Sequence, residues 1–353
     1  MTSKPDFKAD ENLDENLDEN LDENLRIGLL GAGHLGAIHA RLIAEIDGLD
    51  LVGIYDPDQQ KAQKVAEACG TQAFESEEAL IEAAEAIDIV TSTSAHLDCA
   101  RLALAAGRHI FVEKPIAHSV DAGREIVKLG QQANVIVQVG HVERFNPAFL
   151  ALADRATGPV FIEGHRLAVF NPRGTDVSVI FDLMIHDLDI VLKLVQSPLS
   201  HVSASGVAVI SDSPDIANVR LEFENGCVAN LTASRISMKS MRRMRLFRPD
   251  AYLTMDFGEK QAQIFTLSDD DTGNLPYVEV NTGDTTTRRF IQMESPDLPE
   301  VNAIKMELEC FRDSIRSNKP VVVSAEEGQA ALELAHQVLD KINERLKKGK
   351  AVS

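Results

Sequence analysis

Three side chains in this sequence are of types that can take part in catalysis, and two of them have the spacing of an acid–base pair. Lys114 lies in the tripeptide Glu113-Lys114-Pro115, directly after an apolar run, and Asp182 and His186 are four residues apart in a segment of helical character. Residues four apart share one face of a helix. A histidine oriented by a carboxylate is an acid–base unit near neutral pH. A cis peptide bond is expected before Pro115. The alternative interpretation of Lys114 is a solvated lysine in a surface turn, and that of His186 is structural packing.

A glycine-rich segment, Gly31-Ala32-Gly33-His34-Leu35-Gly36, matches the phosphate-binding turn of dinucleotide-binding domains. It follows an apolar run and opens a predicted helix, which is the context that gives the motif meaning. Gly31 permits the tight turn, Gly33 lets the backbone approach a pyrophosphate, and Gly36 allows helix and strand to pack closely. The pyrophosphate then lies at the positive N-terminus of the helix.

Asp56 ends the second apolar run and predicts which dinucleotide binds. A carboxylate at this place accepts hydrogen bonds from the adenosine ribose. It also repels the 2′-phosphate of NADP, because two unit charges 4 Å apart interact by about 4 kcal/mol at an effective dielectric constant of about 20. We therefore predict NAD as the cofactor in preference to NADP.

The elements that position these residues alternate regularly through the first part of the chain. Apolar runs predict strands at Arg26–Leu30, Leu51–Tyr55, Ile87–Thr91, His109–Val112 and Val135–Val139, with a short additional strand at Ala73–Phe74. Helices are predicted between them at His34–Ile46, Asp58–Cys69, Ser76–Ala84, His96–Ala106 and Ser119–Ala133. Such alternation predicts a parallel sheet with right-handed crossovers, and ligands bind at the C-terminal ends of its strands.

The pattern changes after Gly140. A long helix is predicted at Asp176–Val195, and two helices close the chain at about Glu300–Ser317 and Ala325–Lys348. Strands dominate between them, at Val202–Ile210, Asn218–Glu224, Cys227–Ser234, Arg242–Leu246 and Ala251–Phe257, with a hairpin turn at Asn225-Gly226.

The predicted fold class is therefore α/β, with two domains. Residues 26–145 form an N-terminal Rossmann domain with a doubly wound parallel sheet, and residues 146–353 form a C-terminal α+β domain with a largely antiparallel open sheet. Residues 1–25 contain four tandem copies of Asp-Glu-Asn-Leu and are predicted to be a disordered acidic tail.

Taken together, GAGHLGAIHARL, the Asp56 turn, Glu113-Lys114-Pro115 and Asp182-x-x-x-His186 resemble the Gfo/Idh/MocA family of sugar and inositol dehydrogenases. The resemblance covers about residues 26–348. It implies that Lys114, Asp182 and His186 surround the hydroxyl that is oxidised. His186 is then the base, Asp182 positions the substrate or relays the proton, and Lys114 hydrogen-bonds the reacting oxygen.

The remaining candidate cofactor residues follow from position. His34 and Leu35 belong to the glycine-rich turn, and Glu113 adjoins Lys114. Thr91 ends the predicted strand Ile87–Thr91 and Ser92 follows it, where the chain passes the nicotinamide ribose. His96 either contacts that ribose or caps its own helix.

The candidate substrate residues lie near the domain junction. Gly140 to Pro147 reads GHVERFNP and resembles segments of family members that act on nucleotide sugars, notably UDP-N-acetylglucosamine 3-dehydrogenases. Arg144 and Asn146 of this segment contact a diphosphate or sugar, or they brace the domain interface. Arg166 and Arg173 add positive charge to the pocket, since an arginine fork suits a diphosphate. Arg242, Arg243 and Arg245 are predicted on a solvent face or a subunit interface.

Composition narrows the class of protein. The net charge of −20 makes a nucleic acid or an anionic membrane a poor partner. No apolar stretch is long enough for a membrane helix, and no secretory signal is recognised, so a cytoplasmic location is expected. The four cysteines form no CxxC pair, and no metal site is predicted.

The predicted function is NAD-dependent oxidation of a secondary hydroxyl of a sugar, nucleotide sugar or cyclic polyol, with C3 of a UDP-hexosamine as the preferred substrate position. Three alternatives stay open: an NAD-dependent glycosidase without net redox change, a reductase of sugar lactones or imines, and a non-catalytic NAD-binding regulator. The resemblance also implies a homodimer or homotetramer that pairs through the open face of the C-terminal sheet.

Overall fold

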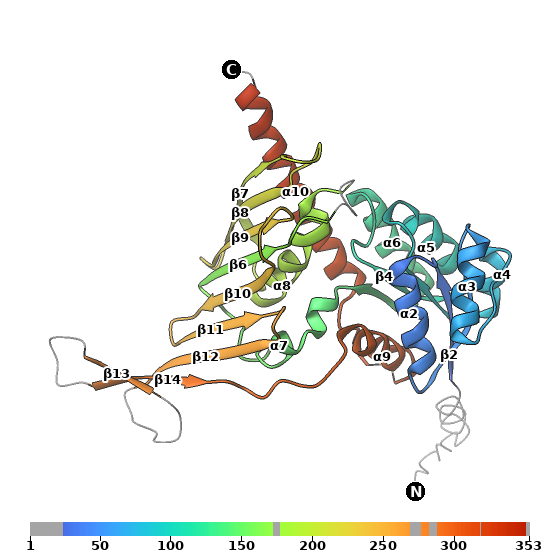
Figure 1. The fold of residues 1–353 in the computed structure, drawn as a ribbon, viewed down its shortest axis with the longest axis horizontal. Coiled ribbons are helices and arrows are strands. Elements are labelled where there is room, and N and C mark those ends of the chain that lie inside the picture. The colour runs from blue at the N-terminus through green and yellow to red at the C-terminus, as the bar shows by residue number, and fades with distance from the viewer. Residues whose placement is uncertain (1–23, 172–176, 269–276, 282–287, 318, 351–353) are drawn as a thin grey trace, which may run out of the picture.

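The computed structural model describes residues 24–171, 177–268, 277–281, 288–317 and 319–350 (Figure 1). The predicted acidic tail and Arg173 lie outside these residues, except for the last two residues of the tail. Five parallel strands form the first sheet in the order β2-β1-β3-β4-β5. They span Leu25–Leu30 (β1), Leu49–Tyr55 (β2), Ala86–Ile89 (β3), His109–Glu113 (β4) and Val137–Gly140 (β5). The predicted strands of the Rossmann domain are thus confirmed, and Ala73 adds a single parallel bridge to Ile54.

Helices cover both faces of this sheet, as a doubly wound fold requires. One face packs against α2 (His34–Glu45) and α3 (Gln59–Cys69), and the other against α4 (Glu77–Ala83), α5 (His96–Ala105) and α6 (Val120–Ala133). Polar residues before three of these helices fix where they begin: the side chains of Asp58, Ser76 and Ser119 each accept a hydrogen bond from the first turn.

The C-terminal part is built on nine strands in the order β13-β14-β12-β11-β10-β6-β9-β8-β7. All neighbouring pairs are antiparallel except β6 and β9. The strands span Phe161–Leu167 (β6), Leu199–Val207 (β7), Ile216–Phe223 (β8), Val228–Ser234 (β9), Met241–Phe247 (β10), Ala251–Asp256 (β11), Gln261–Ser268 (β12), Tyr277–Asn281 (β13) and Arg288–Glu294 (β14). The largely antiparallel sheet is therefore confirmed, and Gly226 has the positive φ of 85° that the predicted hairpin requires.

Short helices connect the two sheets and differ from the predicted pattern. A 3₁₀ turn, η2 (Val142–Phe145), and α7 (Pro147–Leu150) follow β5. The predicted long helix is instead a π-helical turn, η3 (Ile180–Met184), that continues into α8 (Ile185–Val195). π-Helical turns inside helices occur frequently at functional sites.

The last two helices tie the two parts of the chain together. Leu308 and Phe311 of α9 (Ala303–Arg316) pack in the core of the Rossmann sheet, although α9 follows the C-terminal strands in sequence. Leu332 of α10 (Ala325–Lys350) packs against the Rossmann core, while Leu334 and Val338 pack in the C-terminal core (Figure 1).

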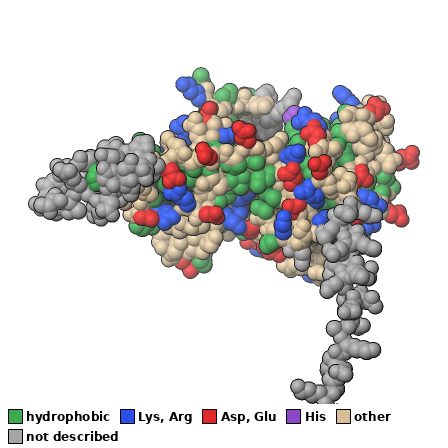
Figure 2. Space-filling model, turned by 90° about the horizontal axis from the view of Figure 1, so that it is seen from below, with side chains coloured by type: hydrophobic (Ala, Val, Ile, Leu, Met, Phe, Trp, Pro, Cys, Tyr) green, Lys and Arg blue, Asp and Glu red, His purple; other side chains and the backbone are tan. Residues whose placement is uncertain are grey.

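The surface is mixed in charge on the face that Figure 2 shows, where acidic and basic side chains are interspersed around hydrophobic ones. Among the described residues, no helix combines the length and the apolar character needed to cross a membrane.

Candidate active site

The glycine-rich turn has the backbone geometry of a pyrophosphate site. Gly31 has a φ of +106°, and a Cβ on Gly36 would lie 2.0 Å from the carbonyl oxygen of Gly31. A Cβ on Gly33 would meet no atom within 4 Å. Gly33 is the N-cap residue of α2, and no side chain of the described residues caps this end of the helix. His34 is exposed in that turn and Leu35 is half-buried. These residues fit the pyrophosphate of a dinucleotide.

Asp56 is half-buried and holds the turn from the side. Its carboxylate accepts hydrogen bonds from the backbone N–H of Ala32 at 2.8 Å and of Asp58 at 2.9 Å. A carboxylate offers about four acceptor positions, so capacity for ribose hydroxyls remains. The fit to NAD therefore rests on this carboxylate together with the open space at Gly33.

Lys114 reaches from the end of β4 to the C-terminal part of the chain. The peptide bond between Lys114 and Pro115 is cis, as expected. The ammonium Nζ of Lys114 donates a hydrogen bond of 2.9 Å to the backbone carbonyl of Asp182. Burial lowers the pKa of this ammonium, while the nearby carboxylates of Asp182 and Glu113 oppose the shift.

His186 lies one helical turn after Asp182 and is close to the positive charges of Lys114 and Arg166. Burial is the largest cause that lowers its pKa well below 6.5, and the charges of Lys114 and Arg166 lower it further. The imidazole is therefore neutral near pH 7 and has a lone pair that can accept a proton. Lys114 and His186, which come from different domains, thus lie together.

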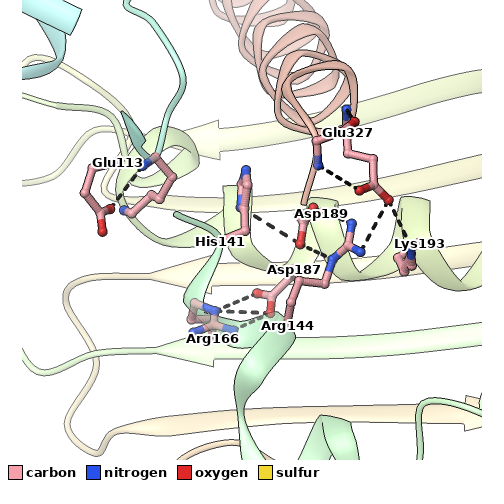
Figure 3. A network of polar contacts seen from close by, with 10 residues as sticks. Glu113, His141, Arg144, Arg166, Asp187, Asp189, Lys193 and Glu327 are labelled. Carbon is pink, nitrogen blue, oxygen red and sulfur yellow. Dashed lines mark hydrogen bonds and ion pairs between the residues drawn. The ribbon is translucent and has the colours of Figure 1, made fainter. Parts of the chain in front are cut away.

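Two of the arginines predicted to bind the substrate, Arg144 and Arg166, form ion pairs with buried carboxylates (Figure 3). Arg144 forms a fork on Asp189, with N–O distances of 2.6 and 2.7 Å. Arg166 is held by Asp187 at 2.8 Å and by Glu143 at 2.7 Å. All five side chains are buried. This arrangement does not support substrate contacts of Arg144 and Arg166, because their donors pair with acids of η2 and α8.

Asn146 is likewise part of the frame. Its amide nitrogen donates to Glu143 at 2.9 Å and to the carbonyl of Phe257 at 3.1 Å, and its oxygen caps α7. Both N–H groups of the amide are thus used within the protein, but Asn146 also lines the cavity beside Arg242, so its contact with a substrate stays a prediction. It braces the junction of the two domains, which was the alternative.

Two predicted cofactor residues also point inward. The carboxylate of Glu113 accepts from the backbone N–H of Lys114 at 3.0 Å, and its other oxygen lies 3.4 Å from His39 in the Rossmann interior. His96 is buried between the carbonyls of Pro115 at 3.0 Å and Thr91 at 3.3 Å, so it ties two strand ends together. Direct contact of either side chain with the cofactor is not supported. Thr91 is half-buried and Ser92 is exposed at the end of β3.

A cavity of about 620 Å³ opens beside the arginine–carboxylate network. Arg242 lines it with about half of its side chain exposed, and its Nη1 lies 4.0 Å from Glu143. The same guanidinium is close enough to lower the pKa of His186. Other residues that line the cavity are Asn146, Met241, Phe257 and Lys260. Arg242 thus lies at the cavity and is also exposed to solvent, as predicted.

Sequence reasoning missed two residues of this site, Arg242 and His141. His141 follows β5 directly, and its ring packs edge-on against that of His186, with ring centroids 6.4 Å apart. The rule that ligands meet the C-terminal ends of strands selected Lys114 and applies equally to His141. Nothing in the local sequence distinguishes Arg242 from its neighbours.

Comparison with known families gives two matches. Residues 25–141 match the model of the "Oxidoreductase family, NAD-binding Rossmann fold", and residues 163–250 match the "GFO/IDH/MocA C-terminal domain".

Three relatives illustrate the range. UDP-N-acetylglucosamine 3-dehydrogenase of Acidithiobacillus ferrooxidans is 35% identical over 315 residues, 89% of this chain and 96% of that protein. Its solved structure has a TM-score of 0.81 at 33% identity and covers 90% of this chain and 98% of that one. The scyllo-inositol 2-dehydrogenase (NAD⁺) of Bacillus subtilis is 30% identical over 60% of this chain and 68% of that protein. Levoglucosan dehydrogenase in complex with NADH and levoglucosan shares the fold, with a TM-score of 0.78 at 18% identity over 91% of this chain and 98% of that one.

Proposed function

Because this chain belongs to the Gfo/Idh/MocA family of NAD-binding oxidoreductases, we propose that it oxidises the C3 hydroxyl of a UDP-hexosamine, with UDP-N-acetylglucosamine as the first candidate. One observation carries the proposal. The Lys114 ammonium lies 2.9 Å from the backbone of Asp182, one turn before His186, at the edge of the sheet that also holds the glycine-rich turn.

The proposed mechanism assigns one task to each side chain. Bound NAD supplies the acceptor for the hydride. Lys114 donates a hydrogen bond to the substrate oxygen and stabilises the negative charge that develops there. His186, neutral because burial and neighbouring cations lower its pKa, accepts the hydroxyl proton. Asp182 orients the substrate.

The nucleotide part of the substrate is assigned to the cavity beside Arg242. Its volume of about 620 Å³ is within the range of small-molecule sites. Among the described residues, the half-exposed guanidinium of Arg242 has one ion pair, a long one to Glu143 at 4.0 Å, so it has donors available for a diphosphate. The buried Arg144 and Arg166 then act as the frame that holds this edge.

The test is the reduction of NAD followed at the absorbance of NADH, with UDP-N-acetylglucosamine, UDP-glucose, myo-inositol and scyllo-inositol as substrates. We expect NADH with the acetylated nucleotide sugar and a product lighter by two hydrogens. Lys114→Met should abolish most turnover while NAD still binds, and Lys341→Met at an exposed ion pair is the matched control. Oxidation of an inositol without oxidation of a nucleotide sugar would overturn the proposed substrate. Release of free sugar without net NADH would favour the glycosidase alternative.

The variant Arg242→Ala tests whether this residue binds the nucleotide part of the substrate. We expect the KM for UDP-N-acetylglucosamine to rise about 10-fold or more, because a charge-assisted hydrogen bond to the diphosphate is lost. The Kd for NAD should stay unchanged. An unchanged KM would remove Arg242 from the proposed substrate site.

The two-domain division at residues 145 and 146, a cytoplasmic location and a homo-oligomer are part of the same proposal. Phe145 packs in the Rossmann core and Ala148 in the C-terminal core, which supports the division. Sedimentation of the purified protein would measure the number of subunits.

A further inference from the structure

His141 is a buried histidine at the reacting centre to which the proposed mechanism gives no task. It follows β5, whose last residue, Gly140, pairs with Glu113 across the sheet, so it lies beside Lys114 at the same sheet edge. The side chain is 1% exposed, and neither ring nitrogen has a hydrogen-bond partner among the described residues. Buried polar atoms in native proteins are nearly always hydrogen-bonded. An unpartnered imidazole at this place therefore calls for a functional explanation.

His186 also has a ring nitrogen without a hydrogen-bond partner among the described residues. This atom is Nδ1, and it is buried. The two rings meet edge-on at an interplanar angle of 88°. Three unpartnered ring nitrogens, two of His141 and one of His186, are thus brought to one place.

On its other side His141 faces a fixed carboxylate. Its Nδ1 lies 3.9 Å from Oδ2 of Asp189, and the fork of Arg144 holds Asp189 at 2.6 and 2.7 Å (Figure 3). A carboxylate so bound still has acceptor positions left. The order in space is therefore Asp189, His141, His186.

We propose that His141 is a positioning residue that links Asp189 to His186 in a carboxylate–imidazole–imidazole chain. The inference rests on the proposed role of His186 as base. Nδ1–H of His141 donates to Asp189, and Nε2 of His141 accepts from Nδ1–H of His186. This leaves the lone pair of His186 on Nε2, which takes the proton from the substrate hydroxyl. Acid–base contacts are often long before the ligand binds, and the 3.9 Å between His141 and Asp189 has to shorten for this hydrogen bond to form.

The surrounding charges explain why such a chain is useful. Lys114, Arg166 and Arg242 face His186, and each of them, like a protonated His141, disfavours a positive charge on it. His141 is faced by Lys114 and Arg144 and by the acids Asp189 and Glu113, and burial lowers its pKa, so it is neutral. A neutral imidazole has one N–H and one lone pair, as the middle member of the chain requires. The chain connects the positive charge that forms on His186 to Asp189, whose Oδ2 lies 3.9 Å from Nδ1 of His141.

The first test compares two variants of similar volume. His141→Leu cannot hydrogen-bond, and we expect kcat to fall about 100-fold, with the KM for the sugar and the Kd for NAD within about twofold. The acid limb of the rate profile should move to lower pH, because His186 loses the acceptor that stabilises its charged form. His141→Gln should recover part of kcat, since its carbonyl can accept from His186. The exposed His201→Gln is the matched control. Equal activity of the Leu and Gln variants would overturn the proposal.

The second test asks whether the two histidines act as a unit. His141→Leu combined with His186→Asn should be no slower than His186→Asn alone, whereas multiplied losses would contradict the chain. Nitrogen NMR of the unaltered protein gives a readout that needs no turnover: His141 should carry its proton on Nδ1, and a proton on Nε2 would overturn the inference. If the unaltered protein oxidises none of the sugars, the proposed function fails, and the tautomer still decides the arrangement of His141.

Discussion

Two neighbouring sets of buried polar side chains are treated in opposite ways by this fold. In the arginine–carboxylate network of Arg144, Arg166 and their acids, every guanidinium is held by carboxylates at distances down to 2.6 Å. At the reacting centre next to it, the ring nitrogens of His141 and Nδ1 of His186 have no hydrogen-bond partner among the described residues. If the proposed function is correct, the side chains with complete hydrogen bonding hold the cleft in shape, and those with unpartnered atoms carry out the chemistry. Four changes test this division, from the largest expected effect to the smallest.

The largest effect is expected at the reacting centre. His186→Asn should lower kcat by about 100- to 10,000-fold, because general acid–base catalysis contributes this much. The free energy of unfolding should change by no more than about 1 kcal/mol, since the ring makes no hydrogen bond at Nδ1. Steady-state rates and urea unfolding measure the two quantities. A large loss of stability with retained turnover would place His186 in the frame instead.

In the arginine–carboxylate network, by contrast, a substitution should mainly affect the stability of the fold. Arg166→Met should lower the free energy of unfolding by about 3–5 kcal/mol, because it leaves the buried carboxylates of Asp187 and Glu143 without their partner. The control is Arg220→Met, which removes an exposed ion pair with Glu222 and should change stability by less than about 1 kcal/mol. Urea unfolding measures both, and equal effects would contradict the division.

Glu307 tests whether an unpartnered buried group can lie away from the reacting centre. Both of its oxygens are buried without hydrogen-bond partners among the described residues, beside His39 and Glu113 in the Rossmann interior. Burial raises its pKa well above 4.5, so the folded state keeps a proton that the unfolded state loses. Stability is then full below about pH 4.5 and falls as pH rises towards the folded pKa, by up to about 1.4 kcal/mol per pH unit.

Glu307→Gln should remove this pH dependence and make the protein more stable than the unaltered chain at pH 8. Urea unfolding at pH 5 and pH 8 measures the difference, with the exposed Glu344→Gln as control. A loss of stability at pH 8 would mean that the ionised carboxylate has a partner that the structure does not describe.

The smallest effect concerns the pH profile of turnover. Because burial lowers the pKa of His186 well below 6.5, kcat/KM should stay level from pH 8 to below pH 6.5 and decline only at lower pH. Burial also lowers the pKa of Lys114 from 10.5, so the alkaline decline should begin below that pH. Arginine partners do not titrate in this range. An acid limb at or above pH 6.5 would show that the base is not this imidazole.

The sequence predicts this fold well because its signals are local. Alternating apolar runs and helices identify the Rossmann strands, and Asn225-Gly226 identifies a hairpin. The strands β12 to β14 were not predicted. The π-helical turn at Asp182 was not predicted either, because a helical pattern does not specify its hydrogen-bond register.

For the candidate site too, some residues are predictable from the sequence and others are not. Lys114 and His186 follow from a motif, whereas the fate of an arginine depends on which acids the fold brings to it. Asp187 and Asp189 are in sequence only neighbours of His186, and no spacing rule pairs them with Arg166 and Arg144. Long-range pairing of charges is therefore the part that the sequence alone does not determine.

Helix α10 contributes Leu332 to one core and Leu334 and Val338 to the other within two turns. A rotation of one domain relative to the other would have to bend α10 or remove its side chains from one of the two cores. The two halves of the chain should therefore melt in a single calorimetric step.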